Sequence, residues 1–124
     1  MSPTINEEWD YLFTHNPKIQ AFAVFTPSEV IWMTSNWNIV PDLENIVNAT
    51  LNDSPSIVVS GVAYNKVDST PESYIASSEN NQGHLLVYLI ELKTWVVAWA
   101  TPDSIPELAI TDLAMTATKL KGSV

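Results

Sequence analysis

Apolar residues recur at helical spacing near the start of the chain. The pattern predicts one buried helical stripe, made of Ile5, Trp9, Leu12 and Phe13. Thr4 and Glu7 have the spacing of a capping box, in which each side chain satisfies a free backbone N–H of the other. The dipeptide Asn16-Pro17 ends the pattern, because a proline disfavours helical backbone in the residue before it. We therefore expect a first helix that begins after Thr4 and ends before Asn16.

Two later segments show the same periodicity. One runs from about Pro41 to Asn52, with acidic residues in its first turn, where the helix dipole favours them. Its expected buried stripe comprises Leu43, Ile46, Val47 and Leu51. The other follows Ser104, which is expected to cap it together with Glu107, and it ends at Gly122. Its expected stripe comprises Ile110, Leu113, Ala114, Ala117 and Leu120.

The remaining apolar runs predict strands. Residues 19–25 and 30–34 flank a turn at Pro27 and are expected to form a hairpin. Residues 57–67 are expected to be one or two extended pieces that pass through Gly61. The short segment 73–78 is polar, and we expect it at an edge of the sheet.

The last two strands carry the strongest signal. Residues 85–90 read Leu-Leu-Val-Tyr-Leu-Ile and residues 95–99 read Trp-Val-Val-Ala-Trp, without alternation. Continuous apolar strands are buried on both faces, and the short connection between these two makes them antiparallel. Helices must therefore cover the sheet above and below. The sequence predicts a single α/β (α+β) domain over residues 1–124, with an antiparallel sheet of five to seven strands sandwiched between helices.

Charge and composition exclude several classes of function. The chain has a net charge of −9, with five Lys and no Arg, which argues against binding to nucleic acid and to anionic membrane surfaces. There is no Cys, so disulfides, thiolate metal sites and cysteine nucleophiles are excluded. No stretch approaches the eighteen or so apolar residues of a membrane-spanning helix, and the start of the chain does not resemble a signal peptide.

The polar residues do not form a catalytic pattern. The two histidines, His15 and His84, lie far apart and lack the spacing of metal ligands. The serines lack a nucleophile elbow, and three glycines are too few for a phosphate-binding loop. We expect no catalytic residues, no metal site, no cofactor and no enzymatic activity.

Several short pieces, in order along the whole chain, resemble the profilin family. They are Trp9 in the first helix, Val-Ile-Trp-Met-Thr-Ser at 30–35, the segment 41–47, Gly-Val-Ala-Tyr at 61–64, and Gly83 before an apolar hairpin and a long last helix. The resemblance implies a profilin-like fold, and the departures from the family pattern fit a divergent, archaeal member. It also implies binding to actin monomers, to proline-rich segments and to phosphoinositides, which profilins bind through different surfaces.

The resemblance implies residues for each partner. The implied surface for actin or an actin-like monomer comprises Asn65, Lys66, Val67, Glu107, Leu108 and Thr111. The implied shelf for proline-rich peptides comprises Trp9, Tyr11 and Trp32, with Phe13 and Trp37 nearby. The alternative, that Trp9, Phe13 and Trp32 are core residues, is favoured because helical spacing predicts burial in any case. An aromatic residue expected late in the last helix is absent, so binding of proline-rich peptides should be weak. Ala63 replaces a family lysine, and phosphoinositide binding should be weak or absent.

The expected function is that of a monomeric, cytoplasmic, cytoskeleton-associated protein that binds actin monomers and regulates filament assembly. The alternative is a scaffold for a small GTPase, because roadblock and longin-type domains share much of the expected architecture. Those domains are usually dimeric. The oligomeric state therefore separates the two hypotheses.

Overall fold

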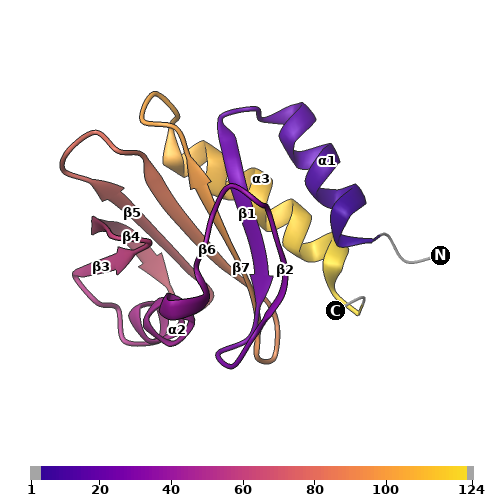
Figure 1. Ribbon diagram of the computed structural model, residues 1–124, viewed down its shortest axis with the longest axis horizontal. Helices are drawn as coiled ribbons and strands as arrows, with labels where there is room; N and C mark the ends of the chain where they lie inside the picture. Colours follow the sequence, from indigo (N-terminus) through magenta and orange to yellow (C-terminus); the bar gives the residue numbers. More distant parts are fainter. Residues whose placement is uncertain (1–3, 123–124) are drawn as a thin grey trace.

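A seven-stranded sheet forms the centre of the computed structural model, which describes residues 4–122 (Figure 1). The helices are α1 (Ile5–His15), a 3₁₀ turn η1 (Val40–Asp42), α2 (Leu43–Leu51) and α3 (Pro106–Leu120). The strands are β1 (Ile19–Phe25), β2 (Val30–Met33), β3 (Ser56–Val59), β4 (Val62–Thr70), β5 (Ser73–Ser78), β6 (His84–Glu91) and β7 (Thr94–Ala100). Their order in the sheet is β2-β1-β7-β6-β5-β4-β3, and every neighbouring pair is antiparallel.

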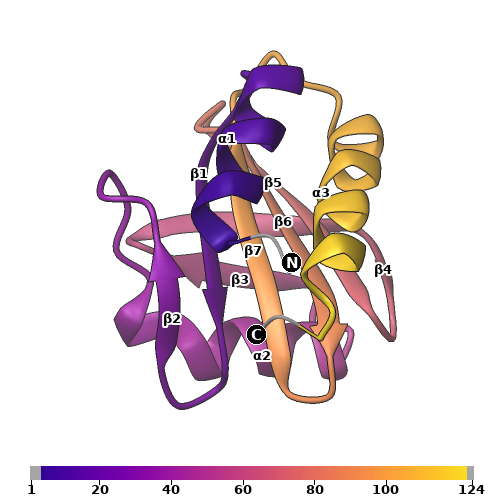
Figure 2. The ribbon, with the colours of Figure 1, turned by 90° about the vertical axis from the view of Figure 1, so that its right-hand side faces the viewer.

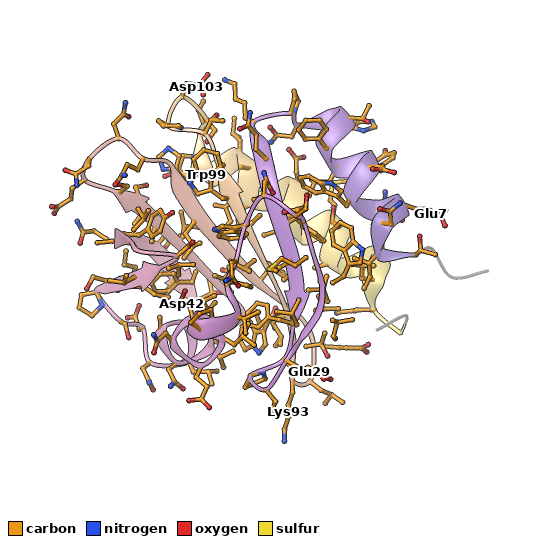
Figure 3. The ribbon with its side chains drawn as sticks, in the orientation of Figure 1. Glu7, Glu29, Asp42, Lys93, Trp99 and Asp103 are labelled. Atoms are coloured by element: carbon orange, nitrogen blue, oxygen red, sulfur yellow. The ribbon has the colours of Figure 1, made fainter. Side chains whose placement is uncertain are left out.

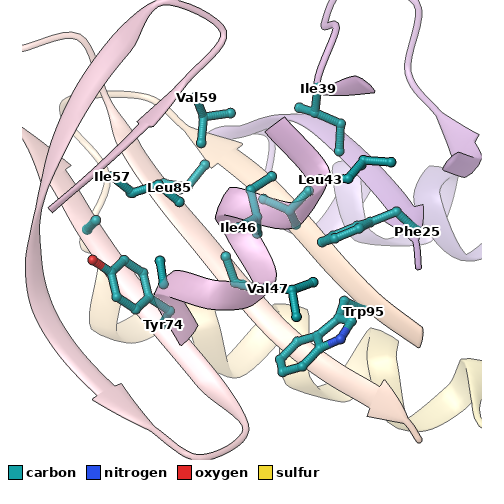
Figure 4. Packing of buried hydrophobic residues seen from close by; sticks show 14 of the residues in the cluster. Phe25, Ile39, Leu43, Ile46, Val47, Ile57, Val59, Tyr74, Leu85 and Trp95 are labelled. Atoms are coloured by element: carbon teal, nitrogen blue, oxygen red, sulfur yellow. The ribbon is translucent and has the colours of Figure 1, made fainter. Parts of the chain in front are cut away.

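Helices cover both faces of the sheet over β6 and β7, as the apolar sequences of these two strands predicted. On one face α2 packs against a cluster that includes Phe25, Ile46 and Trp95 (Figure 4). On the other face α1 and α3 pack over a second cluster, which includes Phe22 and Leu113 (Figure 2). Trp95 and its neighbour Val96 belong to opposite clusters, so β7 is buried on both sides. The predicted fold class is confirmed, at the upper end of the expected number of strands.

The start of α1 has the Thr4 half of the predicted capping box, whereas the Glu7 carboxylate accepts from the Thr4 hydroxyl. The buried stripe of this helix is narrower than expected. The Thr4 side chain accepts a hydrogen bond of 3.1 Å from the Glu7 backbone N–H. Leu12 is buried, whereas Phe13 is 43% exposed, so its expected burial is wrong. The helix contacts the sheet along a line through Leu12, and Phe13 lies beside that line.

The other two helices depart from the pattern near their ends. Leu51 is 62% exposed rather than buried, because it lies in the last turn of α2, beyond the sheet contact. Ser104 does not cap α3. Its hydroxyl donates to the Thr101 carbonyl at 2.6 Å, and Ile105 takes the N-cap position without a side-chain hydrogen bond. The buried residues of α3 are Ala109, Leu113, Thr116, Ala117 and Leu120, with Ile110 and Ala114 at the margin of that set.

The expectation that residues 73–78 form an edge strand is wrong. This segment is β5, and it pairs with β4 on one side and β6 on the other. The three residues at its centre, Tyr74, Ile75 and Ala76, are buried in the two hydrophobic clusters on either side of the sheet. The edges of the sheet are β2 and β3. The segment 57–67 is a hairpin that turns at Ser60 and Gly61, both with positive φ angles.

Candidate functional site

The sheet face that α1 and α3 cover is left open over β3 and β4. The helix α3 packs on β5, β6 and β7, and beyond it the strands carry exposed side chains. Val58 and Val67 are 53% and 46% exposed. Val58 lies between Ile57 and Val59, which face α2, so its own side chain is on the open face. The chain thus presents a mixed polar and apolar strand surface beside a helix.

A row of three paired residues crosses this face from β4 toward α3. Asn65 pairs with Ser77, and Ser77 pairs with His84. The Ser77 hydroxyl lies 2.7 Å from Nδ1 of His84, and Nε2 of His84 lies 3.3 Å from the Pro102 carbonyl oxygen. A carbonyl can only accept, so in a neutral ring Nε2 carries the proton and Nδ1 accepts from Ser77. His84 therefore connects the open strands to the loop that leads into α3.

The sequence did not predict roles for Ser77 and His84. Strand alternation from Asn65 could have indicated which residues of β4 share a face. It could not have indicated which residues of β5 and β6 lie opposite, because that depends on register. Asn65 also donates from Nδ2 to Oε1 of Glu79 at 2.5 Å, which places an acidic group beside the Asn65 end of the same row.

The predicted residues at the start of α3 are exposed. Leu108 is 63% exposed, and Glu107 and Thr111 are also open to solvent. The helix α1 lies against the opposite flank of α3, where Nδ2 of Asn16 donates to Asp112 at 2.9 Å. With 3.6 residues per turn, Glu107 falls on the flank that faces the open strands, and Leu108 and Thr111 fall on the outer surface.

Lys66 lies on the other face of the sheet from these residues. It pairs with Ala76, which belongs to the cluster beneath α2, and its Nζ lies 2.7 Å from Oδ1 of Asp53. The hydrogen bonds from Lys66 and Ser69 hold the pKa of the Asp53 carboxyl below its usual value. A β-bulge follows Lys66, and Val67 is the extra residue. Five of the six predicted residues thus stay accessible, while Lys66 is occupied on the opposite side.

The predicted aromatic shelf is only partly assembled. Trp9 stacks on Phe22 at 5.4 Å between ring centroids, and Trp32 meets the edge of Phe22 at 6.0 Å. Trp9, Phe13 and Trp32 line a groove of about 520 Å³ between α1 and the end of β2. These two predicted shelf residues and Phe13 therefore share one surface.

Tyr11 does not share that surface. It lies on the α3 side of α1, where its ring stacks on His15 at 4.0 Å and the Lys119 ammonium lies 3.8 Å from its centroid. Lys119 also lies 3.9 Å from Oε1 of Glu8. The contacts of Lys119 with Tyr11 and Glu8 join α3 to α1. Trp37 is likewise separate, because it packs against the α2 cluster.

Within residues 4–122, no group of three or more His, Asp or Glu side chains is arranged to hold a metal ion. None of the described helices is long and apolar enough to span a membrane. The polar groups of the open face instead pair with one another or with the backbone.

A seven-stranded antiparallel sheet, with α1 and α3 on one face and α2 on the other, defines the profilin fold. No family model matches the chain. It is 31% identical to Thor profilin of Thorarchaeota archaeon (strain AB_25) over 109 residues, which cover 86% of this chain and 85% of the relative. It is 27% identical to Odin profilin of Odinarchaeota yellowstonii (strain LCB_4) over 92 residues, covering 74% and 76%. The chain belongs to the profilin family.

A solved structure has the same fold over the full length of this chain. In the LokiProfilin2/Rabbit Actin Complex, a chain with 26% sequence identity superposes with a TM-score of 0.88, covering 100% of both chains. The predicted family and fold, including a divergent archaeal type, are therefore confirmed.

Proposed function

We propose that this protein binds actin or an actin-like monomer and thereby regulates filament assembly. The observation that carries the proposal is the full-length match, at a TM-score of 0.88, to a profilin solved in complex with rabbit actin. The open sheet face beside α3 supplies a surface that the fold itself leaves uncovered. When this protein is bound to an actin monomer, it covers part of the surface of that monomer and so restrains the addition of the monomer to a filament.

The proposed interface combines exposed residues of the open strands with residues on the flank and outer surface of the start of α3. It comprises Asn65, Val67, Ser77, His84, Glu107, Leu108 and Thr111. Leu108 and Val67 supply apolar area, and the Asn65–Ser77–His84 row supplies polar groups. Because the surface lacks a basic cluster, binding depends on apolar and polar contact more than on charge. Lys66 is left out, since it is paired with Asp53 on the other face.

The protein acts as a single-domain monomer without enzymatic activity, in the cytoplasm and in association with the cytoskeleton. Membership in the profilin family supports this proposal. Phosphoinositides bind weakly or not at all, because the chain has no Arg and a net charge of −9. Three of its five lysines are also paired with acidic side chains.

The test is titration calorimetry of the protein into monomeric actin, together with the rate of actin polymerisation. We expect binding of one protein per monomer, slower polymerisation, and an affinity that changes by less than about threefold between low and moderate salt. Size-exclusion chromatography should give a monomer. A tight dimer that neither produces heat with actin nor slows polymerisation would remove this proposal in favour of a GTPase scaffold.

A second, weaker binding function is supported by the groove between α1 and β2. Polyproline helices dock on aromatic surfaces, and Trp9, Phe13 and Trp32 line this one. Without Tyr11 the aromatic surface is short, so proline-rich peptides should bind weakly. Chemical-shift changes at the Trp9 and Trp32 indoles on addition of a proline-rich peptide test this, and the absence of shifts at these two indoles would exclude it.

A further inference from the structure

The turn between β6 and β7 carries an apolar residue where folding gives no reason for one. The turn residues are Leu92 and Lys93, between the paired residues Glu91 and Thr94. Leu92 has a φ of 44° and is 92% exposed. Glycine, asparagine and aspartate adopt this backbone conformation with less strain than leucine does. A leucine in this strained conformation that is 92% exposed contributes little to the core, so packing of the fold does not explain it.

Leu92 stands at the rim of an apolar cleft. The cleft measures about 590 Å³ and is walled by three segments that are distant in sequence. Pro27 comes from the β1–β2 turn, Val47 and Leu51 come from α2, and Leu89 and Trp95 come from β6 and β7. Leu51 is itself 62% exposed. A cleft of this size accommodates one or two large apolar side chains.

Lys93 is the one charged residue that lines the cleft. Among residues 4–122 no carboxylate lies within 4 Å of its ammonium, whereas Lys18, Lys66 and Lys119 each have an acidic partner. The rest of the chain is strongly acidic, with a net charge of −9. An unpaired ammonium beside an apolar cleft is complementary to a ligand that carries an apolar side chain and a carboxylate.

The cleft lies away from the surface proposed for actin. The β1–β2 turn, the β6–β7 turn and α2 lie together at one end of the sheet (Figures 1 and 2). Lys93 lies at this end, and Asp103, just before α3, lies at the opposite end (Figure 3). Val47 of α2 and Trp95 of β7 belong to the cluster on the α2 side of the sheet (Figure 4). A ligand in the cleft therefore leaves the open face beside α3 free.

We propose that this cleft binds a short segment of another polypeptide, which inserts a large apolar side chain beside Leu92 and Leu51 and pairs a carboxylate with Lys93. The segment carries one or two carboxylates rather than many, because the net charge of the chain repels a strongly acidic partner. The same repulsion acts between two copies of this chain, which disfavours a second copy as the occupant. The protein then connects its main partner to a second polypeptide.

The test is a titration of the full chain with a short peptide, followed by NMR. The peptide has blocked termini and contains two leucines, one phenylalanine and one aspartate. We expect shifts of the backbone amides at Leu51, Leu92 and Lys93, with a dissociation constant on the order of 0.1 mM or tighter. The same peptide with asparagine in place of aspartate should bind about two- to fivefold more weakly, since it cannot form the solvent-exposed ion pair with Lys93.

Two variants separate binding from folding. Leu92→Asn should weaken peptide binding at least about tenfold while the melting temperature stays the same or rises, because asparagine suits the positive φ. Lys93→Gln should remove the preference for the aspartate peptide. Leu108→Asp, on the distant start of α3, is the matched control and should bind the peptide as the natural chain does.

Three results would overturn the proposal. The first is an absence of shifts at the cleft up to about 1 mM peptide. The second is equal binding by the natural chain and Leu92→Asn. The third is concentration-dependent self-association that Leu92→Asn abolishes, which would assign the cleft to a second copy of this chain.

Discussion

Lys66 Nζ lies 2.7 Å from Oδ1 of Asp53, on the α2 side of the sheet, while Asn65, one residue earlier, faces the open side. Strand alternation separates these two neighbours by the thickness of the sheet. Lys66 therefore stabilises the junction between α2 and β4 rather than contributing to the proposed actin surface.

The first prediction concerns this pair. Lys66→Glu places a second carboxylate beside Asp53, and it should lower the free energy of unfolding only slightly, because the pair is exposed to solvent on the Asp53 side. Actin affinity, measured by calorimetry, should change by less than about threefold. A loss of tenfold or more in affinity, with the fold intact, would place Lys66 in the interface.

The second prediction concerns Leu108, the most exposed apolar residue of the proposed interface. Leu108→Asp should weaken actin binding at least tenfold, about 1.4 kcal/mol, because a charge would replace apolar contact area. The fold should stay intact, since Leu108 is 63% exposed.

Met115→Asp is the matched control for Leu108. Met115 is 55% exposed on the same helix, about two turns further from its start. Calorimetry with actin should give an affinity for Met115→Asp within about threefold of the natural chain. Equal losses in both variants would mean that the whole outer surface of α3, and not its start, contacts actin.

The third prediction concerns Trp95, which is 3% exposed beneath α2. Trp95→Asp should unfold the protein, because burial of an unpaired carboxylate costs several kcal/mol. Val58→Asp on the open face should leave the protein folded, since Val58 is 53% exposed. Circular dichroism and urea unfolding measure both. A soluble, cooperatively folded Trp95→Asp variant would contradict the two-layer core.

The fourth prediction concerns Tyr64, whose burial raises its pKa to about 12. The unfolded chain titrates near pH 10, so the folded state favours the neutral phenol. This contribution to stability is fully present below about pH 10 and is lost as the pH rises toward about 12. Urea unfolding should show that the natural chain loses more stability over this range than Tyr64→Phe does. Equal losses would mean that the Tyr64 hydroxyl reaches solvent.

Much of the fold follows from local sequence signals. The Thr4 cap, the hairpin β1–β2 and the doubly apolar pair β6–β7 were predictable because each depends on residues close together in the chain. The predictions that were wrong concern residues whose burial depends on neighbouring strands or helices. The serines in residues 73–78 indicated an edge strand. The strand instead lies between β4 and β6, and Tyr74, Ile75 and Ala76 at its centre are buried.

The candidate sites divide in the same way. Helical periodicity placed Leu108 off the buried stripe, and its exposure confirms that inference. The sequence could not place Tyr11 against Lys119, nor Lys66 against Asp53, because these contacts join elements that meet only when the sheet is assembled.

By itself, the sequence determined the elements, the two-sided burial of the sheet and the absence of a basic surface, because periodicity and charge are local properties. The tertiary structure alone decided which side chains share a face. It joined Asn65, Ser77 and His84 through cross-strand register, and it brought Leu51 to the same cleft as Leu92. Strand pairing fixes register over long range, so single-residue alternation within one strand cannot reveal it.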